Sequence, residues 1–84
     1  MYELRIRRRV MKDIARLPDN YPRLVSEHID RLAENPRPPE ARKLTGDEGY
    51  RLRVGVYRIL YGIDDADRVV TVYRVKHRRE AYRR

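Results

Sequence analysis

The chain of 84 residues contains no cysteine, and this absence sets the first limits on its chemistry. Without a thiol the chain forms no disulfide and offers no thiolate as a nucleophile or a metal ligand. A metal site would have to combine His28, His77 and scattered carboxylates, and the two histidines lack the spacing of a paired metal motif. The four glycines are scattered and form no nucleotide-binding loop. We therefore expect a protein that uses neither a metal ion nor a cofactor.

Long apolar runs are also missing. Residues 1–6 alternate between polar and apolar types, which is unlike the apolar core of a signal peptide. No segment approaches the ~20 apolar residues that a membrane-spanning helix needs. These features predict a cytoplasmic protein that does not associate with membranes.

Positive charge, in contrast, is abundant, with 21 basic and 13 acidic residues and a net charge of +8. It is concentrated in the second half of the chain. Residues 50–61 contain three arginines and no acidic residue, and residues 68–84 contain seven basic residues and one glutamate. Such a surface attracts phosphate polyanions whatever their base sequence. Arginine-rich surfaces can also be merely solvated, so charge alone leaves both interpretations open.

Hydrophobic periodicity predicts four strands and two helices. Alternating or β-branched stretches indicate strands at residues 2–6, 50–54, 56–63 and 69–75. Apolar residues at helical spacing indicate one helix on each side of Pro18, which ends the first because the residue before proline disfavours helical geometry. Asp19 or Asn20 can cap the second helix.

The order of these elements predicts the fold class. The proline-rich residues 35–43 are expected to form a stiff, extended connection, although a ligand for a proline-recognition domain has the same composition. The result is an α+β fold of two layers, in which an N-terminal strand and a helical hairpin pack on a mainly antiparallel four-stranded sheet. A short basic tail, residues 78–84, completes the chain, and residues 1–84 are expected to form a single domain.

Three arginines on one predicted hairpin are the main candidates for a functional site. Alternation places Arg51 and Arg53 on the strand face opposite the apolar residues, and Arg58 of the next strand falls on the same face. The hairpin thus presents these three guanidinium groups with no carboxylate between them. Like charges directly across a sheet are destabilising, which favours an anionic ligand. Three solvated surface arginines would give the same pattern.

Other side chains carry weaker signals. His77 lies among basic residues, where it could act as an acid or a base near phosphate or be merely exposed. His28 belongs to an apolar helical stripe, which favours a buried or rim position over catalysis. Asp64, Asp65 and Asp67 could suggest a metal site, but their composition is typical of a turn.

The segment from Tyr50 to Arg83, YRLRVGVYRILYGIDDADRVVTVYRVKHRREAYR, resembles the signature of the RelE family of toxins. It contains an arginine-rich strand, a GxYR turn, a tyrosine-containing strand and a terminal HRRxxY motif. The first half, with its short strand, helical hairpin and NPRPPEARKLTG connection, is also similar to the family. The resemblance covers essentially the whole chain, and the C-terminal motif is its more specific part.

The resemblance implies a toxin of a type II toxin–antitoxin system. Such a toxin is a metal-independent endoribonuclease that cleaves mRNA on the ribosome through attack by the RNA 2′-hydroxyl, which inhibits translation and arrests growth. A RelB-like antitoxin inhibits it, and the complex binds operator DNA through the antitoxin. The catalytic residues that the resemblance implies are Arg51, Arg53, Arg58, Arg78 and Tyr82.

Each of these residues is expected to have a distinct role. Arg58 and Arg78 would stabilise the scissile phosphate, and Arg51 and Arg53 would position phosphate or assist a base. Tyr82 would stack on a base or transfer a proton. The residues expected to contact RNA beside the HRR motif are Lys76, His77 and Arg79, and His77 could also serve as the base.

Two departures from the family pattern stand out. Val56 lies where the GxYR turn usually has an acidic residue, and Lys76 lies where a glycine usually precedes HR. Two rival functions remain open. One is that of the related ParE branch, which poisons DNA gyrase without nuclease chemistry. The other is a non-catalytic RNA-binding module that uses basic strands and tyrosines as a stacking surface.

Overall fold

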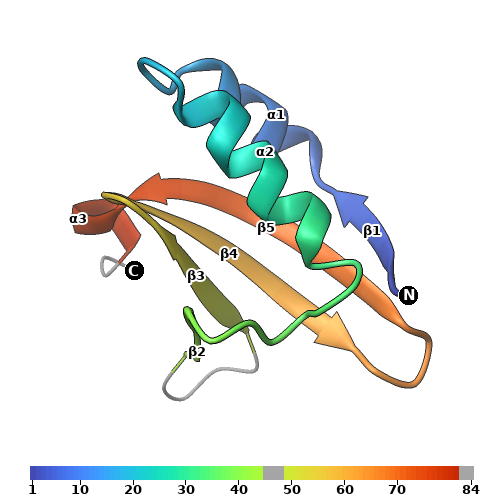
Figure 1. Ribbon diagram of the computed structural model, residues 1–84. Helices are drawn as coiled ribbons and strands as arrows, with labels where there is room; N and C mark the ends of the chain where they lie inside the picture. The colour runs from blue at the N-terminus through green and yellow to red at the C-terminus, as the bar shows by residue number, and fades with distance from the viewer. Residues whose placement is uncertain (45–48, 82–84) are drawn as a thin grey trace.

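The computed structural model describes residues 1–44 and 49–81. The strands are β1 (Glu3–Ile6), β2 (Ala41–Lys43), β3 (Tyr50–Val54), β4 (Tyr57–Asp64) and β5 (Val69–His77), and the helices are α1 (Arg8–Ala15), α2 (Tyr21–Arg31) and α3 (Arg78–Ala81). The strands form one sheet in the order β1-β5-β4-β3-β2, and α1 and α2 lie together on one of its faces (Figure 1). Neighbouring strands are antiparallel except for β1 and β5, which are parallel. The predicted two-layer α+β class is confirmed.

The sheet has five strands, whereas the sequence predicted four. The additional strand is β2, which lies in the stretch interpreted as an extended connection and pairs with β3. It has only three residues and no alternation of polar and apolar types. An edge strand of this kind forms because β3 supplies hydrogen-bonding partners, so nothing in its own composition indicates it.

The helical layer forms where apolar residues recur at helical spacing. Val10 of α1 and Val25 and Ile29 of α2 are buried. Pro22 lies in the first turn of α2, where its missing N–H costs no helical hydrogen bond. Asn20 precedes α2, as predicted, but its side chain makes no capping hydrogen bond. Among the described residues, no helix has both the length and the apolar composition required to cross a membrane.

The tight turn between β3 and β4 depends on Gly55. Its φ of +59° lies in the left-handed region, which side chains with a Cβ rarely adopt. A Cβ at this position would also overlap the hydroxyl oxygen of Tyr21 in α2. Both the backbone conformation and the packing therefore require glycine here, and α2 lies against the turn that precedes Arg58.

The core lies between the helical layer and the sheet. Its most deeply buried side chains are Val10, Val25, Ile29, Leu32, Leu52, Ile59, Tyr61, Val70 and Val72. Tyr61 donates its buried O–H to the carbonyl oxygen of Pro36 at 2.6 Å, and burial raises the pKa of Tyr61 to about 12. This hydrogen bond fixes the connection after α2 to the sheet.

A β-bulge determines which residues of β5 face the core. Tyr73 has no partner in β4, because the register shifts between Leu60 and Tyr61 of that strand. The extra residue reverses the alternation, so that Val72 and Val75 are both buried although they are three positions apart. Residues after the bulge therefore lie on the faces opposite to those that unbroken alternation would give.

Asp13 joins α1 to the part of β5 that extends beyond β1. Its carboxylate accepts the backbone N–H of Val75 at 2.9 Å and the guanidinium Nε and Nη2 of Arg74 at 2.9 and 3.3 Å. Burial alone would raise the pKa of Asp13, but the hydrogen bonds from Arg74 and Val75 outweigh it and lower the pKa. Asp13 thus fixes the end of β5 that leads into the basic residues 76–79.

Candidate nucleic-acid interface

The sheet face opposite the helices carries the predicted arginines. Arg53 is exposed and Arg51 is half-buried on β3, whereas the alternate residues Leu52 and Val54 are 1% and 5% exposed in the core. Alternation along the strand therefore separates the two sets as the sequence indicated. We refer to this side of the sheet as the open face.

Three basic residues form a row across the open face. Arg53 of β3 lies directly opposite Arg58 of β4, and Arg58 lies directly opposite Lys76 of β5. Neighbouring strands lie about 4.8 Å apart, so the row concentrates positive charge within a short distance. Like charges in this arrangement repel one another, and an anion bound between them would relieve the repulsion.

Arg58 is the one buried charged side chain among the described residues, with 8% of its surface exposed. Its Nη1 donates to the carbonyl oxygens of Gly55 and Tyr57 at 3.2 and 3.1 Å. The turn that Gly55 makes possible thus holds the guanidinium in place. Both hydrogen bonds involve one nitrogen, which leaves Nε and Nη2 able to donate to a phosphate.

A hollow of about 420 Å³ opens beside this row. Its lining residues are Pro39, Glu40, Arg42, Arg51, Arg53 and Arg58. We call it the arginine hollow. The sequence did not indicate Arg42, which lies directly opposite Arg51, nor Glu40, because the strand that brings them here was missed.

Glu40 adds a carboxylate that the sequence did not indicate to the lining of the arginine hollow. The β3–β4 hairpin itself contributes none, but Glu40 reaches the hollow from the connection just before β2. The site therefore combines guanidinium groups with a group that can accept a proton.

The residues at and before the HRR motif lie on different sides of the sheet. Lys76 shares the open face with Arg58. His77 lies opposite Tyr57 with the two ring centroids 5.6 Å apart, and Tyr57 packs on Tyr21 of α2, so His77 is on the helix side. Its Nδ1 accepts the backbone N–H of Arg79 at 3.3 Å.

Arg78 begins α3, and its backbone N–H donates to the carbonyl oxygen of Val56 at 2.7 Å. This bond fixes α3 to the β3–β4 turn, with the side chains of Arg78 and Arg79 exposed. The structure thus brings Arg51, Arg53, Arg58 and Lys76 together and places Arg78 next to their end of the sheet. Tyr82 lies outside the described residues.

The turn that contains Asp64, Asp65 and Asp67, here called the acidic turn, has a structural role. Asp65 accepts hydrogen bonds from Nη1 and Nη2 of Arg37 at 3.2 and 2.8 Å and from the hydroxyl of Tyr2 at 2.6 Å. These bonds, that of Arg37 first, lower the pKa of Asp65 to about 2. Asp64 accepts the backbone N–H of Asp67 at 3.0 Å, as in a turn. Within residues 1–44 and 49–81 no cluster of three or more metal-ligating side chains occurs.

His28 is held by its own helix. It is half-buried, and its Nδ1 lies 2.7 Å from the carbonyl oxygen of Leu24, so Nδ1 carries the proton and donates it. This is the buried or rim position that the apolar stripe favoured, on the sheet face away from the arginine hollow.

The sequence and the fold are those of a known class of protein. Residues 4–82 match the family described as the ParE toxin of the type II toxin–antitoxin system parDE. The chain is 34% identical over 86 residues to a protein named toxin RelE1 of Methanocaldococcus jannaschii, with 98% of this chain and 96% of the relative covered. It is 33% identical over 90 residues to toxin RelG of Mycobacterium tuberculosis, with 99% and 98% covered.

A solved structure agrees with these relatives. The chain is similar to the archaeal RelE–RelB complex from Pyrococcus horikoshii OT3, with a TM-score of 0.81 and 32% sequence identity. The similarity covers 92% of this chain and 94% of the matched chain. The chain therefore belongs to the RelE/ParE superfamily of type II toxin–antitoxin toxins, and within it to the RelE type.

Proposed function

We propose that this toxin is a ribosome-dependent endoribonuclease that cleaves translated mRNA without a metal ion. The observation that carries the proposal is the arginine hollow. Arg58 is held rigidly by two carbonyl groups beside Arg51 and Arg53, and a carboxylate lines the same space. This combination fits a phosphodiester of single-stranded RNA better than a neutral ligand.

The reaction needs little from the protein beyond position and charge. The 2′-hydroxyl oxygen of the RNA attacks the adjacent phosphorus, and the bond from phosphorus to the 5′-oxygen of the next nucleotide breaks. The products are a 2′,3′-cyclic phosphate and a 5′-hydroxyl. Arg58 and Arg78 stabilise the charge on the phosphorane, and Arg51 and Arg53 position the phosphate. Guanidinium groups suit these roles because they stay protonated at neutral pH.

The proton of the 2′-hydroxyl requires an acceptor, which an arginine does not provide. Among the described residues, Glu40 is the carboxylate that lines the arginine hollow, and we assign it as the general base. His77 lies on the other side of the sheet, which makes it the weaker candidate. Tyr82 stacks on a base or gives a proton to the departing 5′-oxygen, as its match to the HRRxxY motif implies.

The ribosome enters the proposal because, among the described residues, a single exposed carboxylate lines the arginine hollow as a base. Holding the RNA in line for attack can contribute several kcal/mol to lowering the barrier. Such a site gains most from a partner that fixes the geometry of the codon. We therefore place the whole chain, as a single toxin domain, in the cytoplasm, where mRNA is translated, and expect translation to stop and growth to arrest.

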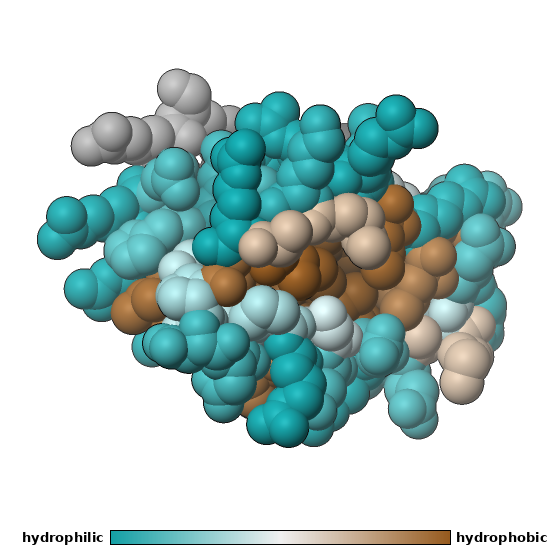
Figure 2. All heavy atoms as spheres, turned by 90° about the horizontal axis from the view of Figure 1, so that it is seen from above, coloured by the Kyte–Doolittle hydropathy of each residue, from teal (hydrophilic) through white to brown (hydrophobic). Residues whose placement is uncertain are grey.

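The partner that restrains the toxin is a RelB-like antitoxin, whose complex binds operator DNA through the antitoxin. The matched structure from P. horikoshii is a RelE–RelB complex, and the net charge of +8 favours rapid association with an acidic protein. On the helical side, an apolar band lies between hydrophilic side chains (Figure 2), and Ile6 and Met11 are 41% and 60% exposed. An acidic, amphipathic segment fits such a surface. Co-purification with the product of the adjacent gene is the direct check.

A second function is inhibition of DNA gyrase, because the matching family is described as the ParE toxin. The basic row across β3, β4 and β5 and the RelE-type relatives favour the nuclease.

Expression of the toxin without a partner, followed by mapping of transcript ends, separates the functions. New ends inside translated codons, with 5′-hydroxyl termini, support the nuclease. A DNA-damage response with intact transcripts supports gyrase inhibition, and unimpeded growth supports a non-catalytic RNA-binding module.

A further inference from the structure

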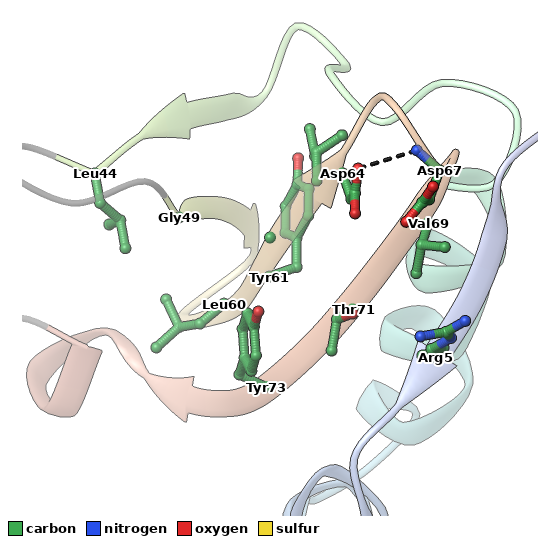
Figure 3. A pocket seen from close by; sticks show the side chains of 12 residues that line it. Arg5, Leu44, Gly49, Leu60, Tyr61, Asp64, Asp67, Val69, Thr71 and Tyr73 are labelled. Atoms are coloured by element: carbon green, nitrogen blue, oxygen red, sulfur yellow. Dashed lines mark hydrogen bonds between the residues drawn. The ribbon is translucent and has the colours of Figure 1, made fainter.

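The open face contains a second hollow, of about 640 Å³, which is larger than the arginine hollow. It extends along β4 and β5 away from the basic row, and the side chains of Leu60, Tyr73 and Thr71 border it in succession (Figure 3). Leu60 lies directly opposite Arg51, so the two hollows adjoin on one surface. Among the described residues, none of those assigned to cleavage lines this second space.

The local backbone conformation directs the side chain of Tyr73 into this hollow. It is the extra residue of the β-bulge, and bulges redirect side chains. Its ring lies against Gly62 of β4, where a Cβ would approach the ring carbon Cε2 and the hydroxyl to 3.1 Å. The guanidinium of Arg7 lies 5.1 Å from the ring centroid. The ring is therefore fixed in place and yet 41% exposed.

Charge on the open face changes sign along the strands. The basic row lies at the Arg58 end, while Asp64 and Asp67 line the far end of the second hollow. Arg5 lines this hollow as well, but its guanidinium forms an ion pair with Glu3 at 2.9 Å, so the carboxylates outweigh it. Arg58 and Gly62 are four residues apart on β4, which corresponds to about 13 Å. A phosphate is attracted to the first end and repelled from the second. The space between them suits an uncharged, flat group that is attached to a phosphate.

We propose that Tyr73 and Leu60 form a nucleobase-binding subsite for single-stranded RNA whose phosphate occupies the arginine hollow. The inference rests on the proposed function, because it takes RNA as the substrate. A base stacks on the tyrosine ring or on the guanidinium plane of Arg7, as unpaired bases do in RNA-binding proteins. Double-stranded RNA is excluded as a ligand, because its bases are stacked on each other.

The alternative occupant is a side chain of a protein partner. The positive charge of the chain attracts an acidic segment elsewhere on the surface. In this hollow Asp64 and Asp67 would repel such a segment. The observations therefore favour a base over an acidic peptide in this hollow.

The test uses the complete toxin and a short single-stranded RNA with a 2′-deoxy sugar at the cleavage position, so that binding is observed without cleavage. 2-Aminopurine is placed at each position in turn, because stacking quenches its fluorescence, and an end label reports affinity independently. The matched variants are Tyr73→Phe, which keeps the aromatic face, and Tyr73→Leu, which keeps an apolar side chain without it. A third variant, Gly62→Ala, displaces the ring.

We expect strong quenching at one position, one or two nucleotides from the scissile phosphate. It persists in Tyr73→Phe, is lost in Tyr73→Leu and is reduced in Gly62→Ala. The affinity of Tyr73→Leu falls about five- to hundredfold, the range for loss of one stacked base. Far-ultraviolet circular dichroism confirms that the variants are folded.

Two results overturn the subsite. In the first, the RNA binds equally well to the wild type, Tyr73→Phe and Tyr73→Leu, with no quenching that depends on the ring. In the second, Tyr73→Leu weakens binding of the co-purified antitoxin and leaves RNA binding unchanged, which assigns the hollow to the protein partner. Mapping of transcript ends tests the nuclease proposal independently of these binding measurements. New ends inside codons support the nuclease even if the subsite is rejected, whereas intact transcripts reject the nuclease.

Discussion

Arg53 and Arg58 lie opposite each other across β3 and β4 but have different surroundings. Arg58 is 8% exposed and held by the carbonyl groups of the turn, whereas Arg53 is exposed. A fixed charge stabilises a transition state without reorganisation, while an exposed one mainly increases the capture of an anion. We therefore expect loss of Arg58 to lower kcat and loss of Arg53 to raise KM.

Glu40 is the residue whose role is most open to a kinetic test. Replacing Glu40 with glutamine keeps the size of the side chain and removes the proton acceptor, so kcat for mRNA cleavage on ribosomes should fall about 10²–10⁴-fold. Cleavage of ribosome-bound mRNA by the wild type, Glu40→Gln and Glu27→Gln, an exposed α2 control, measures this. A kcat of Glu40→Gln equal to that of the wild type rejects Glu40 as the base.

At the scale of the elements, alternation and helical spacing were sufficient to predict most of the fold. Helices α1 and α2 and the strands β1, β3, β4 and β5 follow from side-chain periodicity. The common face of Arg51, Arg53 and Arg58 follows from it as well. These features are local, because each depends on residues that are close together in the sequence.

The features that the sequence did not indicate depend on contacts between distant segments. β2 exists because β3 pairs with it, and it brings Arg42 and Glu40 to the site. The bulge at Tyr73 places Lys76 in the basic row, whereas unbroken alternation would have placed it on the helix side. Arg37 belongs to an unremarkable loop in the sequence, yet it binds a carboxylate 28 positions away.

The N-terminus of α1 lacks the interactions that usually stabilise the start of a helix. Its first turn contains no acidic residue, Arg7 makes no capping hydrogen bond, and Arg8 and Lys12 are like charges at i and i+4. Replacing Arg8 with glutamate complements the helix dipole and creates a favourable i,i+4 pair, so the free energy of unfolding should rise by about 0.5–1 kcal/mol.

Urea unfolding at low ionic strength measures this gain, and 1 M salt should reduce it because the effect is electrostatic. Arg8→Gln, which removes the charge without reversing it, should give an intermediate value. Equal stability of all three proteins would show that charge at this terminus has no effect on stability.

Two aspartates that join separate elements predict the response to acid. The folded-state pKa of Asp65 is about 2, below its ordinary 3.8, and that of Asp13 is also lowered. Between pH 2 and 4 the unfolded chain therefore binds more protons than the folded chain. Their contribution to stability is complete above about pH 5 and is lost as the pH falls towards 2.

Urea unfolding of the wild type and Asp65→Asn at pH 6 and pH 2.5 tests this expectation. The variant should be less stable at pH 6, and the difference between the two proteins should be much smaller at pH 2.5. Asp30→Asn, on the exposed side of α2, should lose stability with acid as the wild type does. A constant difference between wild type and Asp65→Asn at both pH values would be inconsistent with the Arg37–Asp65 bond.

In the whole molecule, the two faces of the sheet have different roles. The helices cover one face and bury the core, while the other face remains open and carries the basic row and both hollows (Figure 1). The acidic turn is bound by Arg37 and Tyr2 at the far end of the sheet. Its negative charge is thereby kept away from the arginine hollow, which remains positive although Glu40 lines it.

A direct role of Arg58 at the scissile phosphate is tested by comparing Arg58→Ala with Arg23→Ala. Both variants remove one arginine, but Arg23 is exposed on α2, on the other side of the sheet. Single-turnover cleavage of mRNA bound to programmed ribosomes is measured at equal concentrations of folded protein. We predict that Arg58→Ala cleaves about 10²–10³-fold more slowly than the wild type and that Arg23→Ala is unimpaired. Equal cleavage rates for the two variants would contradict the proposed mechanism.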